Sequence, residues 1–241
     1  MVPRFGRFAA GLFVLLALWG HPFLRGQADH LPHDDSDWWS ITGSTDDVGE
    51  MRIQDRELPR TSFRVLGVDL SEDAVTRIQR RLGQTQTISR GDASTGREQA
   101  CYRSSPEPAT YMIAEEGEVN SAFYLFNEGA PWNGRELCKR SELVSGSIGT
   151  DSGVHLGQSP EQVTTILGRP SRRSQSEIIY FLSTKKETPP DAAARCRAQH
   201  PEQSPEELHE DCDVYDLTVY IRARFVHARL VYLGVSVAET D

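Results

Sequence analysis

The sequence predicts an α+β protein of two tandem modules, each with one or two short helices packed on an antiparallel meander. Two observations lead to this prediction. A short helix pattern that begins at a serine and ends at a glycine occurs twice, and strand-like runs follow each copy. The copies lie about ninety residues apart, and a fixed order of elements at such a period is typical of repeats. Chance similarity is the alternative, because serine-capped helices that end in glycine are common.

The first segment, residues 1–28, has the pattern of a secretory signal peptide. Arg4 and Arg7 precede an apolar run over residues 8–19, which is shorter than the roughly 20 residues of a membrane-spanning helix. Small residues at the end of the segment offer a cleavage site, while cleavage after Gly20 and an uncleaved anchor are alternatives. We therefore expect a periplasmic or secreted protein that is not inserted in the membrane after cleavage.

The net negative charge of the chain indicates which classes of molecule it can bind. Segment 1–28 contains three arginines and no acidic residue, so the formal net charge of −9 becomes −12 once it is removed. Affinity for nucleic acid comes largely from basic side chains that neutralise phosphates. We therefore expect no nucleic acid and no anionic lipid surface as partner, but another envelope or secreted protein.

Residues 29–60 form an acidic stretch without sustained periodicity, which we interpret as a tail or linker. Trp38 and Trp39 within it are large apolar groups that either dock on the following domain or meet a partner. The histidines and aspartates of residues 30–35 are types that bind transition metals, but such loose tails are more often solvated. We predict no metal site and no cofactor.

The first module is expected over residues 61–145. Its helix begins with Ser71 as N-cap and ends at Gly83. The apolar stripe of this helix consists of Val75, Ile78 and Leu82. The strand-like runs that follow are residues 98–104, 110–116 and 118–126.

The second module is expected over residues 146–241. Ser159, Pro160 and Gln162 form a helix start with a capping box, and Gly168 ends the helix. Strand-like runs follow over residues 177–184, 214–225 and 229–236, with a tight turn near His227 and Ala228. A polar insertion, residues 188–213, separates the first two of these runs. Loops of this kind are common places for function.

Four cysteines in an exported chain indicate disulfides, and three pairings are possible. We favour Cys101–Cys138 with Cys196–Cys212, because each pair then lies within one segment. A metal site is the weaker interpretation, since no CxxC pair supplies neighbouring thiolates.

The stretch HLGQSPEQVTTILGRP, followed by IIYFL, resembles the module of the outer-membrane assembly lipoprotein family called SmpA/OmlA or BamE. The residues that carry this resemblance are Gly157, Ser159, Val163, Leu167, Gly168 and Pro170. The tandem, disulfide-bonded architecture also looks like that of the β-lactamase inhibitory proteins. Both families are protein-binding scaffolds, so the resemblance implies a binding role, although no cysteine before Cys101 could carry a lipid.

A non-enzymatic binding or envelope-assembly role is therefore our leading hypothesis. The alternative is a small secreted hydrolase with Asp/Glu acid–base chemistry, which requires two carboxylates in one cleft. We interpret Glu115, Glu116 and Glu118 beside Gly117 as a solvated hairpin turn. The GTDSGV stretch at residues 149–154 resembles a serine-protease motif, but it lacks a glycine before Asp-Ser-Gly and a histidine in a suitable context.

The last two strand-like runs supply the predicted partner-binding residues. Alternation places Tyr215, Leu217, Val219 and Ile221 on one face of the sheet and leaves the other face open. Tyrosine and arginine are enriched at binding hot spots, and they are also ordinary on an open sheet face. The residues expected on or near this open face are Tyr220, Arg222, Arg229 and Tyr232.

Overall fold

The computed structural model describes residues 51–70, 73–90, 96–105, 108–118, 120–127 and 138–240. In these ranges nine strands form one sheet, and two further strands pair separately. Helices and a mostly antiparallel sheet occur together, which confirms the predicted α+β class. None of the helices in the described part of the chain is long and apolar enough to cross a membrane.

The elements follow one another in two series. The first comprises η1 (Arg60–Phe63), β1 (Arg64–Val65), β2 (Val68–Asp69), α3 (Ala74–Leu82), β3 (Thr87–Arg90), β4 (Arg97–Arg103), β5 (Thr110–Gly117), β6 (Asn120–Asn127) and β7 (Lys139–Arg140). The second comprises α4 (Pro160–Leu167), β8 (Arg172–Arg173), β9 (Glu177–Glu187), α5 (Pro190–Gln199), α6 (Pro205–Leu208), η3 (His209–Asp213), β10 (Val214–Val226) and β11 (Arg229–Thr240).

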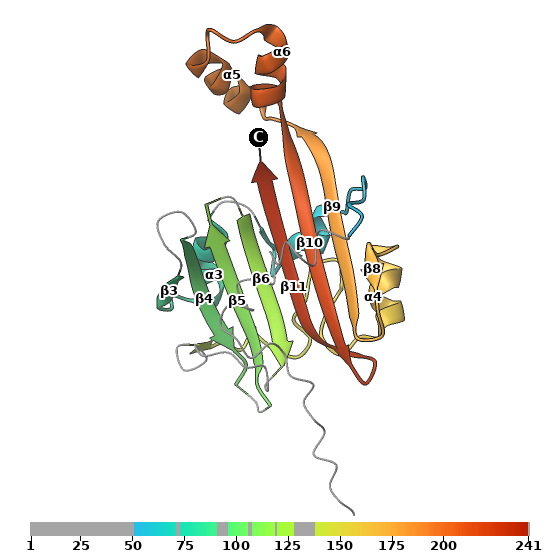
Figure 1. Ribbon diagram of the computed structural model, residues 1–241. Coiled ribbons are helices and arrows are strands. Elements are labelled where there is room, and N and C mark those ends of the chain that lie inside the picture. The colour runs from blue at the N-terminus through green and yellow to red at the C-terminus, as the bar shows by residue number, and fades with distance from the viewer. Residues whose placement is uncertain are drawn as a thin grey trace, which may run out of the picture.

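The sheet joins the two series edge to edge. Its order is β3-β4-β5-β6-β11-β10-β9-β8, and β7 lies parallel to β4 outside this path. Each series is therefore a helix followed by four consecutive antiparallel strands, and the final strands β6 and β11 pair at the centre (Figure 1). Both predicted modules thus contribute to a single sheet.

Helices α3 and α4 both end at a glycine whose carbonyl oxygen accepts a hydrogen bond from a tyrosine of the sheet. The carbonyl oxygen of Gly83, after α3, accepts a hydrogen bond from the hydroxyl of Tyr102 on β4 at 2.9 Å. The carbonyl oxygen of Gly168, after α4, accepts one from Tyr180 on β9 at 3.0 Å. Burial raises the pKa of each tyrosine to about 12, so both hydroxyls keep the proton that they donate. This shared arrangement favours the repeat, which stays a prediction.

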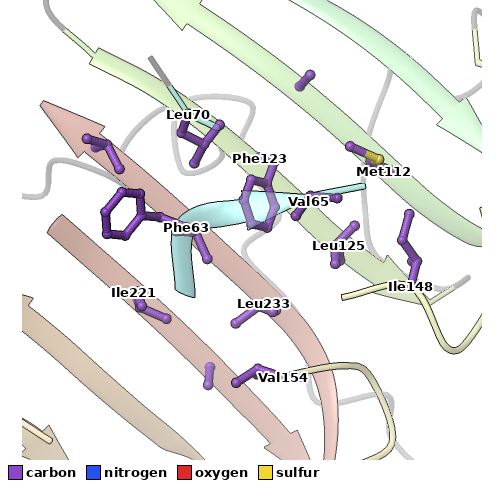
Figure 2. Packing of buried hydrophobic residues seen from close by; sticks show 14 of the residues in the cluster. Phe63, Val65, Leu70, Met112, Phe123, Leu125, Ile148, Val154, Ile221 and Leu233 are labelled. Atoms are coloured by element: carbon purple, nitrogen blue, oxygen red, sulfur yellow. The ribbon is translucent and has the colours of Figure 1, made fainter. Parts of the chain in front are cut away.

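One face of the sheet holds the main core. Phe123 and Leu125 of β6 pack there with residues of β5, β10 and β11, under η1 and the loop at residues 141–158 (Figure 2). Leu217, Val219 and Ile221 lie on this face as the alternation predicts, and Tyr215 packs at its edge. The loop contributes further buried side chains, which are Val144, Ile148, Val154 and Leu156.

Helix α4 follows the predicted capping pattern. Ser159 Oγ accepts from the Gln162 backbone N–H at 3.3 Å, and Gln162 Oε1 accepts from the Ser159 N–H at 2.8 Å. Pro160 occupies the first helical position, and Gly168 has φ +77°, which favours glycine. Val163 and Leu167 bury the apolar stripe. These signals act within one helix, so they could be read from the sequence.

Helix α3 is capped from elsewhere in the fold. The predicted cap Ser71 lies outside the described residues. Asp73 has φ +65° and makes no side-chain cap bond. The Glu116 carboxylate on β5 accepts from the backbone N–H groups of Asp73 at 2.9 Å and Val75 at 3.2 Å. Glu116 is thus a helix cap, and its interpretation as part of a solvated turn was wrong.

Replacing Glu116 with alanine is expected to lower the free energy of unfolding by about 1 kcal/mol, because two amides at the positive end of α3 lose their acceptor. Urea unfolding followed by circular dichroism measures this change. Glu118, exposed on the same hairpin, is the matched control, and its replacement with alanine should change stability by less than about 0.5 kcal/mol. Equal losses in the two variants would contradict the capping role.

Both predicted disulfides are present. Cys101 bonds to Cys138, and Cys196 bonds to Cys212, with Cα–Cα distances of 4.5 Å and 5.5 Å. The tight turn between β10 and β11 is also confirmed, since His227 and Ala228 both have positive φ. Two consecutive residues with positive φ match the right-handed twist of a hairpin.

Candidate functional site

The predicted partner-binding residues do not form one group. Tyr220, Arg222 and Tyr232 share the sheet face opposite the main core, which we call the second face. Tyr220 and Arg222 alternate along β10, and their partners on β11, Ser236 and Gly234, alternate with Tyr232. Arg229 lies at the end of the β10–β11 hairpin, where its guanidinium donates to the Gly157 carbonyl at 3.0 Å.

The second face is not an open surface at these positions. Tyr220 is 7% exposed and Tyr232 is 1% exposed, so the expectation of exposed tyrosines was wrong. Large side chains cluster around them. Tyr220 packs with Met51 and Ile179, and its ring makes a T-shaped contact with that of Phe181. Tyr232 belongs to a second cluster, together with Cys101, Tyr111, Tyr124 and Phe126. Their part in partner binding stays a prediction.

Arg222 belongs to an ion cluster around Glu177 at the start of β9. Oε1 of Glu177 lies 2.5 Å from Arg222 Nε and 3.2 Å from Arg224 Nε, and Oε2 lies 3.0 Å from an Arg172 nitrogen. Burial would raise the pKa of Glu177, but the arginines, Arg222 foremost, outweigh it and lower this pKa. The carboxylate is thus held ionised and joins β8, β9 and β10. The sequence YIRARF signals such a cluster, since alternation places its two arginines on one face.

The Glu177 cluster predicts a specific pH dependence. Because the pKa of Glu177 is lower in the folded state than its ordinary value of 4.5, the cluster stabilises fully above about pH 4.5. This contribution is lost as the pH falls through the lowered folded pKa. Urea unfolding of the wild type and of Glu177→Gln should give free energies that converge as the pH falls below about 4.5. A difference that stays constant or grows on acidification would contradict the assignment.

A second carboxylate, the buried Glu115, ties β4, β5 and β6 together. It is 1% exposed, and Arg97 lies 2.9 Å from its Oε1. Gln99 donates to its Oε2 at 2.6 Å, and the Tyr124 hydroxyl donates to its Oε1 at 3.2 Å. Burial, followed by the charge of Glu115, raises the pKa of Tyr124. The interpretation of Glu115 as part of a solvated turn was wrong. Its partners lie on neighbouring strands, and the local sequence around Glu115 does not indicate them.

Both carboxylates are engaged by structural partners on neighbouring strands. A general acid needs a raised pKa, whereas the pKa of Glu177 is lowered.

The stretch at residues 149–154, which resembles a serine-protease motif, is also engaged in structural hydrogen bonds. Asp151 Oδ2 accepts from Arg64 Nε at 2.6 Å, and the Ser152 hydroxyl bonds to that of Thr150 at 2.8 Å. The hydrolase alternative gains no support from these groups and stays a prediction.

The insertion at residues 188–213, which we call the knob, stands at the tip of the β9–β10 hairpin. Figure 1 shows α5 and α6 beyond the ends of the other strands. Within the knob, which the structure describes completely, only Ala193 and Cys212 are buried. Seven acidic residues and two arginines make its surface negative.

Several bonds hold the knob in shape. The Cys196–Cys212 disulfide joins α5 to η3, and an ion pair joins Arg197 to Asp213. The Thr188 backbone N–H donates to the Asp213 carbonyl at 2.8 Å and closes the base of the knob. Ser204 and Glu207 form a capping box on α6. The knob is therefore an ordered, exposed element that adds little to the core.

The predicted features of the tail, which include Trp38, Trp39 and the residues at 30–35, lie outside the described residues. Among the residues that are described, no group of three or more His, Cys, Asp and Glu side chains is arranged to hold a metal ion. No protein-family model matches the sequence, and no curated protein or solved structure matches it significantly.

Proposed function

We propose that this chain is an exported, non-enzymatic binding protein that contacts a partner protein through the knob. The proposal rests on one observation. The knob buries almost no apolar surface, and yet several bonds hold it in a single shape. A polar excursion of this kind contributes little to the stability of the core. Its disulfide, its cap and its closed base fix one shape, and a preformed shape reduces the entropy lost on binding.

The site differs from the sheet face expected from the sequence. Tyr220 and Tyr232 pack inside clusters of the second face, and Arg222 is engaged with Glu177. A partner that used these side chains would have to displace their neighbours. The knob requires no such displacement, because most of its side chains are already exposed.

Export and an envelope-assembly or inhibitor-like role belong to the same proposal. Two disulfides and the apolar segment after Arg7 support an oxidising compartment such as the periplasm or the exterior. The resemblance of residues 157–170 to the SmpA/OmlA module supports a scaffold role. The shared helix ends at Gly83 and Gly168 support a tandem pair of such modules.

The test removes the knob without disturbing the sheet. Glu187 pairs directly with Val214, so an Asn-Gly turn in place of residues 188–213 closes the hairpin. We expect this variant to fold with the wild-type sheet and to lose the partner that the wild-type protein captures from an envelope or secreted fraction. Undiminished capture of that partner would overturn the proposal.

A charge variant provides the finer comparison. Glu206 and Glu210 are exposed on the knob, and their joint replacement with lysine should weaken capture at least about tenfold if the negative surface contacts the partner. The matched control replaces Glu118 and Glu142, which are exposed elsewhere, and changes the net charge equally. Equal weakening in both variants would indicate a general charge effect and would contradict binding through the knob.

A further inference from the structure

A cleft of about 480 Å³ lies outside the knob, since none of its lining residues belongs to residues 188–213. It is lined by residues 52–56 on one side and residues 169–171 on the other. The first segment precedes all the elements of the sheet, and the second follows the glycine that ends α4. Arg169 and Pro170, which directly follow the glycine that ends α4, therefore form part of one wall of a concave surface.

Both walls are held in place by bonds to the sheet edge. The Gln54 N–H donates to the Phe181 carbonyl at 3.0 Å, and the Ser183 N–H donates to the Gln54 carbonyl at 3.2 Å. On the other wall, the Ser171 N–H donates to the Ile179 carbonyl at 2.8 Å. Both segments thus lie against the same strand, β9, and the cleft opens between them.

Arg56 connects the two walls. Its two terminal nitrogens donate to the carbonyls of Leu167 at 2.9 Å and Arg169 at 3.1 Å. Gly168 leaves room for this guanidinium, since a Cβ there would lie 2.8 Å from an Arg56 nitrogen. The Arg56 Nε is buried without a hydrogen-bond partner among the described residues. The bonds of Arg56 therefore fix a cation in the lining of the cleft and hold its two walls together.

Positive charge predominates in the lining of the cleft. Arg52, Arg56 and Arg169 line it with one acid, Asp55, in a protein whose formal net charge is −9. Arg52 and Arg169 are exposed, so their guanidinium groups are accessible to a ligand. A concave site lined by three cations and one acid concentrates anions locally.

The same wall offers features that suit an extended peptide. Gln54 directs its N–H and C=O towards β9, so those of Ile53 and Asp55 face away from that strand. Such an edge can pair with an added strand. The Ile53 side chain is 50% exposed and is one of two large apolar side chains exposed in the described part of the chain.

We propose that this cleft binds an extended acidic peptide segment of a partner protein. Carboxylates of the segment pair with Arg52 and Arg169, and an apolar side chain packs on Ile53. This site is separate from the knob and goes beyond the binding role proposed above, because it assigns a second surface with the opposite charge preference.

The test measures binding of a fluorescent octapeptide of alternating glutamate and valine by anisotropy. Joint replacement of Arg52 and Arg169 with glutamate should weaken binding at least about tenfold, through the loss of two charge-assisted contacts. The matched control replaces Arg80 and Arg81, exposed on α3, with glutamate and should change affinity less than about twofold. Unfolding in urea verifies that each variant is folded.

Three results would overturn the proposal. The first is equal weakening in the α3 control, which would indicate a net-charge effect. The second is equal binding of an octapeptide of alternating lysine and valine. The third is loss of peptide binding in the protein whose knob is replaced by Asn-Gly, which would move the site to the knob. Retained peptide binding in that protein, together with loss of the captured partner, is the expected result and separates the two proposals.

Discussion

Replacing Phe123 with alanine is expected to lower the free energy of unfolding by about 4 kcal/mol. Phe123 is 1% exposed and lies on β6, the strand that joins the two halves of the sheet. It faces Ala114 of β5 and Val235 of β11 in the register and points into the main core (Figure 2). Removal of the ring leaves a cavity between elements from both halves.

Urea unfolding measures this loss. Phe123→Leu is the control, because it keeps most of the volume and should cost less than about 1.5 kcal/mol. Since both halves share one sheet and one core, the variant should unfold in a single transition that is shifted as a whole. Two separate transitions, or a loss from Phe123→Ala below about 1 kcal/mol, would contradict the continuous sheet.

Replacing Glu177 with glutamine is expected to lower the free energy of unfolding at neutral pH by about 2 kcal/mol. The side chain of Glu177 is 15% exposed, and that of Arg222 is 11% exposed. The neutral amide cannot compensate the charges of Arg172, Arg222 and Arg224. Mutual repulsion and the desolvation cost of these partly buried cations then act against the folded state.

The control for this prediction is an ion pair in solvent. Glu161 lies 2.9 Å from Arg173, and the two side chains are 72% and 46% exposed. Solvent screens such a pair, so Glu161→Gln should leave the free energy of unfolding nearly unchanged. Equal effects at both positions would show that burial does not strengthen the Glu177 cluster.

Local signals allowed part of this fold to be predicted. The α4 cap and the turn at His227 each depend on a few consecutive residues, so the sequence specifies them directly. The disulfide pairing followed from the placement of each cysteine pair within one segment. In contrast, the pairing of β6 with β11 joins positions far apart in the chain, and no local pattern determines it.

The candidate site was harder to predict for the same reason. Alternation identified which residues share the second face, but the burial of Tyr232 depends on aromatic residues of other strands. The Glu116 cap on α3 also depends on the approach of a distant strand. The knob could be located in the sequence from its composition and its two cysteines. Only the structure shows that it has a fixed shape and is exposed.

The binding role of the knob is tested most directly by site-specific photo-crosslinking. A photoreactive amino acid replaces Glu206 on α6 or, as control, Arg80 on α3, and each protein is exposed to envelope and secreted fractions of the source cells. We predict one discrete adduct from position 206 that unlabelled wild-type protein competes away, and none from position 80. No adduct from position 206, or the same adducts from both positions, would contradict the account.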